Sequence, residues 1–202
     1  MSNKHFIHLE GMDLAGKSTI AKIIAQRSCL DWNIYCKCLS KSNPILNLAN
    51  DLGGKNIYDD KIYGYLFYVA VMADLNGFNL EENTIQDSFL LLRSIVFHRN
   101  NNNYDLVKLF EGLVEEHPVP EFSFYLTASI EERQRRFNNR LNNNPKKVTR
   151  SDSLIFKDPI TFAKMDCELM ELSKKYFNSI VIDTSKMTRE EIAEYIIGFC
   201  GV

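Results

Sequence analysis

The chain has 202 residues, of which 45% are hydrophobic and 25% are charged, and its formal net charge is −2. This length is sufficient for one domain with a buried core, and the near-neutral charge offers no basic surface for nucleic acid or an anionic membrane. No apolar run is long enough to span a bilayer, and the first nine residues are too short and too polar for a signal peptide, so we expect a cytoplasmic protein.

Five β-type stretches alternate with helical stretches along the chain, and they cover residues 6–9, 33–39, 84–86, 122–127 and 180–183. Such alternation is typical of βαβ units, which form a parallel sheet with helices on both faces. Right-handed crossovers then bring the carboxyl ends of the strands, where ligands bind, to one edge of the sheet. We therefore expect an α/β fold, built as a single domain over residues 1–202.

Helix starts and loops are marked by local signals. Ser129 followed by Glu132, and Thr188 followed by Glu191, have capping-box spacing before helical runs. The asparagine-rich residues 100–103 and 142–145 interrupt the periodic segments and are predicted to be exposed loops.

The five cysteines are Cys29, Cys36, Cys38, Cys167 and Cys200, an odd number without metal-ligand spacing. Cys36 and Cys38 alternate along the second predicted strand, which would place both on one face. We expect reduced, buried thiols without a chemical role.

A glycine-rich loop follows the first strand and precedes a helical run. Gly11 and Gly16 allow turns that point successive backbone N–H groups at phosphate oxygens, and the helix start adds its unpaired N–H groups. Lys17 would reach the β- and γ-phosphates of ATP, and Ser18 would bind Mg²⁺. A chance glycine-rich turn is the alternative. The predicted phosphate cradle consists of Gly11, Met12, Asp13, Leu14, Ala15, Gly16, Lys17, Ser18 and Thr19.

Arginines gather on the helix predicted after the fourth strand. Arg133, Arg136 and Arg140 are three and then four residues apart, so they share one helical face. Arginine supplies the fixed, bidentate positive charge that phosphoryl transfer requires, and residues 133–153 are therefore predicted to form a lid over the phosphates. The alternative is a solvated basic face near a helix C-terminus.

The loop Leu9-Glu10-Gly11-Met12-Asp13-Leu14-Ala15-Gly16-Lys17-Ser18-Thr19 resembles the Glu-Gly-x-Asp-x-x-Gly-Lys-Ser-Thr signature of thymidylate kinases. Residues 120–126 and 130–133 are similar to the strand and lid helix of that family, and residues 182–185 to its adenine loop. The resemblance implies a three-layer P-loop kinase fold with a helical lid, ATP and Mg²⁺ as cofactors, and a homodimer. It also implies that Asp13 lies near the acceptor and the metal, although Asp13 could instead only brace its own loop.

The acceptor side departs from the family pattern. Leucine at 75 and serine at 88 stand where the family has arginines, and residues 39–44 lack the family's acid and glycines. Because a nucleoside monophosphate brings two negative charges, a cation must replace these arginines. Arg93 is our candidate, since it lies six residues after Asp87, about where the related deoxynucleoside kinases carry an arginine; Lys41 and Arg99 are weaker candidates. Asp87 at the end of the third strand is expected to serve the Mg²⁺ shell or to orient the acceptor.

Three functions are compatible with these residues. The leading one is ATP-dependent phosphorylation of a nucleoside monophosphate, dTMP above all, with Lys17, Asp13, Arg93, Arg133, Arg136, Arg140 and Asp87 in the catalytic site. The missing arginines leave open a kinase of a neutral hydroxyl acceptor, such as a deoxynucleoside or a specialised metabolite, although no glutamate follows the second strand as a general base. A non-catalytic nucleotide-binding protein is the third reading.

Overall fold

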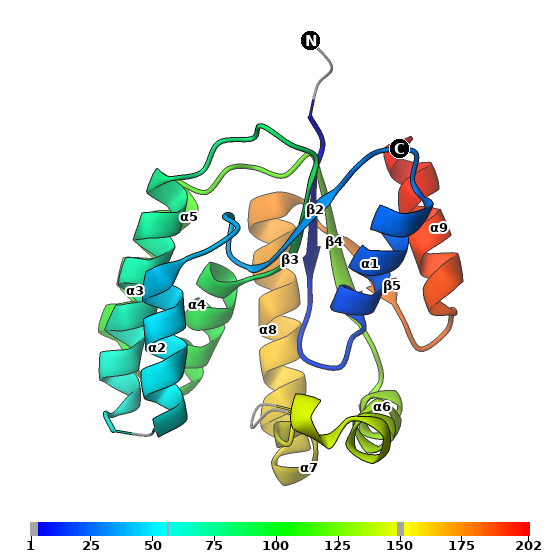
Figure 1. Ribbon diagram of the computed structural model, residues 1–202. Helices are drawn as coiled ribbons and strands as arrows, with labels where there is room; N and C mark the ends of the chain where they lie inside the picture. The colour runs from blue at the N-terminus through cyan, green and yellow to red at the C-terminus, as the bar shows by residue number, and fades with distance from the viewer. Residues whose placement is uncertain (1–3, 56, 149–151) are drawn as a thin grey trace.

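The computed structural model describes residues 4–55, 57–148 and 152–202 (Figure 1). Within these residues, five parallel strands form one sheet in the order β2-β3-β1-β4-β5. The strands are β1 (Phe6–Glu10), β2 (Asn33–Lys37), β3 (Thr84–Phe89), β4 (Phe122–Thr127) and β5 (Ile180–Asp183). The predicted α/β fold with a five-stranded parallel sheet is confirmed.

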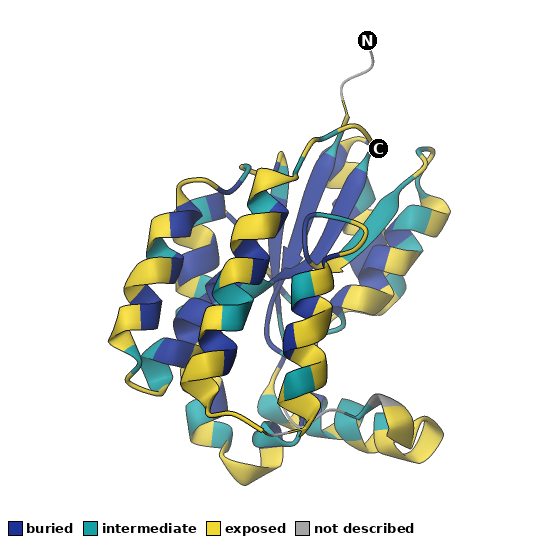
Figure 2. Ribbon diagram, turned by 60° about the vertical axis from the view of Figure 1, so that its left-hand side comes forward, coloured by how far each residue is buried: buried dark blue, intermediate teal, exposed yellow. Residues whose placement is uncertain are grey.

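Helices cover both faces of the sheet, and the strands between them are largely buried (Figures 1 and 2). On one face, α1 (Lys17–Arg27) and α9 (Arg189–Cys200) pack on each other and on the apolar side of β1 that carries Ile7 and Leu9. On the other face, α4 (Leu90–Asn100), α5 (Tyr104–Val114) and α8 (Pro159–Phe177) pack around Phe6 and Phe89.

The remaining helices lie outside these layers. Helices α2 (Pro44–Lys55) and α3 (Asp60–Asn76) pack on each other at the outer side of the α4–α5 layer. Helix α6 (Ile130–Asn143), the 3₁₀ turn η1 (Pro145–Lys147) and α7 (Leu154–Lys157) lie beyond the carboxyl ends of the strands (Figure 1). Residues 149–151 of the predicted lid lie outside the described residues. No helix in the described residues is long and apolar enough to cross a membrane.

Three strand boundaries differ from the expectation. Strand β1 runs one residue further, to Glu10. Strand β3 continues to Phe89 because it lies between β2 and β1, where the polar residues Gln86 and Asp87 are buried beside these neighbours. Strand β2 ends at Lys37, which has a φ of 66° and breaks the register with β3. The shared face predicted for Cys36 and Cys38 is therefore wrong, since Cys38 is buried outside the strand and Cys36 is exposed.

The cap and thiol predictions are confirmed in part. Thr188 and Glu191 form the full capping box of α9, whereas at α6 the Ser129 side chain accepts from the Glu132 N–H. Helix α6 continues to Asn143, so the predicted loop at 142–145 begins two residues later. All five cysteines are free, but only Cys38 and Cys200 are buried.

Candidate active site

The loop between β1 and α1 has the backbone that its two glycines predict. Gly11 has a φ of 142°, and a Cβ atom there would lie 2.1 Å from the carbonyl oxygen of Leu126 on β4. Gly16 has a φ of 100° and caps the N-terminus of α1. Leu14 also has a positive φ, 66°, although it is not a glycine. The carboxyl end of β1, the P-loop and the start of α1 thus form a continuous phosphate-type cradle.

Lys17 is enclosed by this loop. Its ammonium group donates to the carbonyl oxygens of Gly11, at 2.7 Å, and of Met12, at 3.2 Å. Burial, with repulsion from Arg93, lowers the pKa of Lys17 despite the opposing effect of the Asp13 carboxylate. Ser18 and Thr19 follow on the exposed side of the first helical turn.

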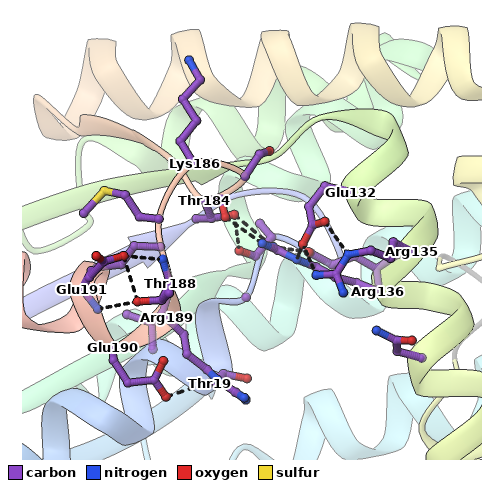
Figure 3. Close-up of a pocket in the computed structure, with 18 of the residues that line it drawn as sticks. Thr19, Glu132, Arg135, Arg136, Thr184, Lys186, Thr188, Arg189, Glu190 and Glu191 are labelled. Atoms are coloured by element: carbon purple, nitrogen blue, oxygen red, sulfur yellow. Dashed lines mark hydrogen bonds and ion pairs between the residues drawn. The ribbon is translucent and has the colours of Figure 1, made fainter.

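A cavity of about 760 Å³ lies beside the P-loop, between α6 and the loop that joins β5 to α9 (Figure 3). Leu14, Ala15 and Gly16 line one wall, and Arg136 and Arg140 line the wall formed by α6. The third wall comprises residues 184–192, which include the last two residues of the segment 182–185 expected to contact adenine. The cavity size suits a nucleotide, and the helix start of α1 opens toward it.

Arg136 connects the three walls of the cavity (Figure 3). Its guanidinium donates to the Leu14 carbonyl at 3.0 Å, to the Thr184 carbonyl at 2.8 Å and to the Glu132 carboxylate at 2.8 Å. Arg135 shares the same carboxylate, and these arginine hydrogen bonds lower the pKa of Glu132 to about 2. Arg140 pairs with Asp152 at 2.9 Å.

Arg133 does not lie where the basic helical face predicted. Its side chain is fully buried, is absent from the cavity wall and points beneath the P-loop, where it donates to the Asp13 carbonyl at 2.6 Å. It also pairs with Asp166 on α8 at 2.9 Å. Helical spacing shows which residues share a face of the helix. It does not show which of them are covered when the helix packs against the sheet edge, as Arg133 is.

The acceptor side contains the cation that the sequence suggested. Arg93 on α4 donates to the Asp13 carboxylate at 2.9 Å and to the Ser88 hydroxyl at 3.3 Å. Burial alone would lower the pKa of the Arg93 guanidinium, but the Asp13 and Glu10 carboxylates outweigh it and raise that pKa. The guanidinium therefore lies beside Ser88, one of the two positions that lack the family's arginine.

Asp87 lies at the carboxyl end of β3, in register with Leu9 of β1 and Cys36 of β2. It is 3% exposed, and its charge is one of three carboxylate charges, with those of Asp13 and Glu10, that oppose the lowering of the Lys17 pKa by burial. The hydroxyl of Ser18 and this carboxylate are oxygen donors of the kind that Mg²⁺ prefers. Among the described residues, no three His, Cys, Asp or Glu side chains cluster in a way that could hold a metal ion.

Glu10 is a site residue to which the sequence patterns assigned no role. Its buried carboxylate accepts from the Gly11 N–H at 2.9 Å, from the Ser88 hydroxyl at 3.0 Å and from the Phe89 N–H at 2.9 Å. Burial raises its pKa, but the neighbouring His8, Arg93 and Lys17 reverse the shift and lower it. An acid at the end of an otherwise apolar strand is the signal that could have revealed this link between the P-loop and β3.

Asp74 is a second residue of this kind, and it holds the segment that lacks the family's glycines. Its carboxylate accepts from the Leu39 N–H and, at 2.6 Å, from the Ser40 hydroxyl. Aromatic residues near the acceptor side belong mostly to the core. The ring centres of Phe89 and His117 are 3.8 Å apart, whereas Phe97 is substantially exposed.

Comparison with known proteins gives a consistent result. Residues 9–196 match the family model described as thymidylate kinase. A probable thymidylate kinase of Methanocaldococcus jannaschii is 27% identical over 210 residues, which cover 98% of this chain and 97% of that protein.

Solved structures with the same fold include two nucleotide-metabolising kinases. A thymidylate kinase from Candida albicans aligns with a TM-score of 0.69 and 17% identity, over 98% of this chain and 91% of that chain. A deoxyadenosine kinase from M. mycoides with bound dATP aligns with a TM-score of 0.63 and 18% identity, over 97% and 99% of the two chains.

Proposed function

This chain belongs to the thymidylate kinase family, and we propose that it transfers the γ-phosphoryl group of ATP to dTMP, which yields ADP and dTDP. The observation that carries the choice of a monophosphate acceptor is the Arg93 guanidinium, held 2.9 Å from Asp13 and 3.3 Å from Ser88 next to the P-loop. A fixed cation at this position provides the charge that the missing family arginines would have supplied.

The donor is bound by the P-loop and the adjoining cavity. The N–H groups of the loop and the start of α1 hold the β- and γ-phosphates, and Lys17 exchanges its contacts with Gly11 and Met12 for phosphate oxygens. Arg136 and Arg140, which line the cavity, neutralise charge on the transferred group. Ser18 and Asp87 would hold Mg²⁺, which when bound would supply positive charge that stabilises the phosphates.

The acceptor is positioned on the other side of the loop. Arg93 meets the dTMP phosphate, while Asp13 orients the accepting oxygen and would lie near the metal ion. Ser88 is short enough to leave room for Arg93, whose side chain enters from α4 rather than from the strand end. Catalysis is then positioning and charge stabilisation, without a covalent intermediate.

A neutral hydroxyl acceptor is the less favoured alternative, because such a substrate brings no charge to the half-buried guanidinium of Arg93. A coupled ADP-release assay tests both readings with ATP and Mg²⁺ against dTMP, dUMP, the other monophosphates, thymidine and the other deoxynucleosides. We expect turnover with dTMP and at least about a hundredfold lower kcat/KM with thymidine, which lacks the phosphate contacts. Equal or better turnover with nucleosides would refute the proposed acceptor.

A homodimer formed through α3 is also part of the proposal. Ile62, Tyr65, Val69 and Met72 follow helical spacing on α3 and are each 40–46% exposed, forming one apolar stripe. In a two-fold symmetric dimer, this stripe would pack against the same stripe of the second copy. Light scattering after size exclusion should give a dimer mass that Val69→Glu converts to monomer. The matched control Ile160→Glu, at an exposed apolar residue of α8, should leave the mass unchanged.

The whole chain is proposed to act as one domain in the cytoplasm. Five free cysteines, three of them exposed, suit a reducing compartment.

A further inference from the structure

Arg133 is placed unusually for an arginine of a lid helix. Its side chain is fully buried, and its guanidinium donates to the Ala128 carbonyl at 2.9 Å and to the Asp13 carbonyl at 2.6 Å. Burial lowers the pKa of Arg133, although the Asp166 carboxylate opposes this shift. A buried arginine carries a large desolvation cost that an apolar side chain would avoid, so packing alone does not account for this residue.

The loop residue next to this contact is in a strained conformation. Leu14 is 5% exposed and has a φ of 66°, in the left-handed region that disfavours residues with a Cβ atom. The peptide before Leu14 is held through the Asp13 carbonyl by Arg133, and the peptide after it through the Leu14 carbonyl by Arg136. Helix α6 therefore restrains both peptides that flank the strained residue.

These two peptides also carry N–H groups of the phosphate cradle. When a peptide carbonyl accepts a hydrogen bond, the peptide becomes more polarised, and the N–H group of the same peptide becomes a stronger hydrogen-bond donor. The contacts of Arg133 and Arg136 therefore act on the N–H groups of Leu14 and Ala15 through the carbonyl ends of the same two peptides.

Arg133 is itself anchored rigidly. Its Nη2 pairs with Asp166 at 2.9 Å, and the same carboxylate accepts from the Tyr125 hydroxyl at 2.7 Å and the Thr127 hydroxyl at 2.8 Å. The guanidinium carbon also lies 5.1 Å from the centre of the Phe162 ring. A group held from α8 and β4 in this way can fix the geometry of the loop it contacts.

We infer that Arg133 is a positioning residue of the donor site, which holds Asp13 and Leu14 in the strained loop conformation that binds the β-phosphate of ATP. The inference relies on the proposed function only for the P-loop as the donor site, and it does not depend on the identity of the acceptor.

Equilibrium binding of Mg·ADP, measured by calorimetry, tests this inference without any acceptor. Asp166→Asn removes the anchor's charge but leaves the contact between Arg133 and Asp13. Arg133→Met in the Asp166→Asn background then removes the contact without leaving a buried unpaired carboxylate. We expect the double variant to bind ADP about ten- to a hundredfold more weakly than Asp166→Asn, which corresponds to the loss of one charge-assisted hydrogen bond. Arg27→Met, an exposed arginine paired with Glu194, is the control and should bind ADP normally.

The strained conformation of Leu14 allows a second test, in which ADP affinity is measured in a Leu14→Gly background; a purely structural role of Arg133 would not make its effect depend on residue 14. Leu14→Gly removes the cost of the left-handed conformation, so the same Arg133 substitution made in that background should weaken ADP binding by less than about threefold. An equal loss in both backgrounds, or a fall in Tm with unchanged ADP affinity, would overturn the inference.

If the double variant does not fold, Arg133→Lys replaces it. Lysine keeps a positive charge beside Asp166 but lacks the second arm of the guanidinium fork. We expect about tenfold weaker ADP binding with a Tm near that of the unmodified chain, and unchanged ADP affinity would contradict the inference. Normal ADP binding by the unmodified chain without dTMP turnover would instead refute the proposed acceptor and leave the role of Arg133 intact.

Discussion

Replacing Arg93 by methionine should impair the use of dTMP while leaving the binding of ATP nearly unchanged. Methionine retains most of the apolar stem and removes the guanidinium, which donates to Asp13 and Ser88 in the structure. Two charge-assisted hydrogen bonds to a phosphate, each worth about 1.5–3 kcal/mol, give a combined loss of roughly 3–6 kcal/mol. At about 1.4 kcal/mol per tenfold change, kcat/KM for dTMP should fall by roughly two to four orders of magnitude.

The assay is steady-state ADP release with the dTMP and ATP concentrations varied separately. We expect KM for ATP to change by less than about threefold, because Arg93 lies on the acceptor side of Asp13 and outside the cavity wall. Arg93→Lys should recover part of the activity, since it restores the charge but not the fork. A loss of less than tenfold for dTMP, or an equal loss of ATP affinity, would refute the assignment of Arg93 to the acceptor phosphate.

Three further predictions follow from individual residues. Lys17→Met should lower kcat at least about a thousandfold without changing the circular dichroism spectrum, because its charge serves the transferred group. Burial lowers the pKa of His117 to about 3, so between pH 7 and pH 5 this residue takes up a proton only in the unfolded chain. The free energy of unfolding measured in urea should therefore fall by about 2 kcal/mol over this range. The variant His117→Phe should not show this loss. Gly11→Ala would place a Cβ atom 2.1 Å from the Leu126 carbonyl and should lower Tm strongly, whereas Gly198→Ala, with open space around it, should leave Tm unchanged or raised.

Much of the fold could be predicted because its signals are local. The alternation of strands and helices, the glycine spacing from 11 to 16 and the cap at Thr188 each depend on neighbouring residues, and the structure contains all of them. Strand β3 was predicted too short because three polar residues in a row carry no strand pattern. Gln86 and Asp87 pair with β1 and β2 on either side, and the Ser88 hydroxyl donates to Glu10, which are tertiary effects.

The candidate site could be predicted only where one segment supplies it. The P-loop is continuous in the sequence, whereas the ion pair of Arg93 with Asp13 joins residues 80 positions apart. The sequence supplied Arg93 as a candidate only through the resemblance to related kinases. The anchor of Arg133, Asp166, lies 33 positions away on another helix and carries no motif of its own.

The contrast between Arg133 and Arg136 shows the limit of helical periodicity. Both residues lie on one face of α6, yet Arg136 lines the cavity and Arg133 is buried beneath the loop. Arg133 in the first turn of α6 reaches Thr127 of β4, whereas Arg136 and Arg140 in later turns line the cavity. One basic helical face therefore contains a residue that is buried beneath the loop and others that line the cavity.

The most direct test of the proposed reaction is ³¹P NMR of a mixture of the purified protein, Mg·ATP and dTMP. The proposed function predicts that the γ-phosphate signal of ATP and the signal of dTMP decrease together, while the signals of ADP and dTDP increase in equal amounts. Release of inorganic phosphate without dTDP, or no change in dTMP while a nucleoside is phosphorylated under the same conditions, would contradict it.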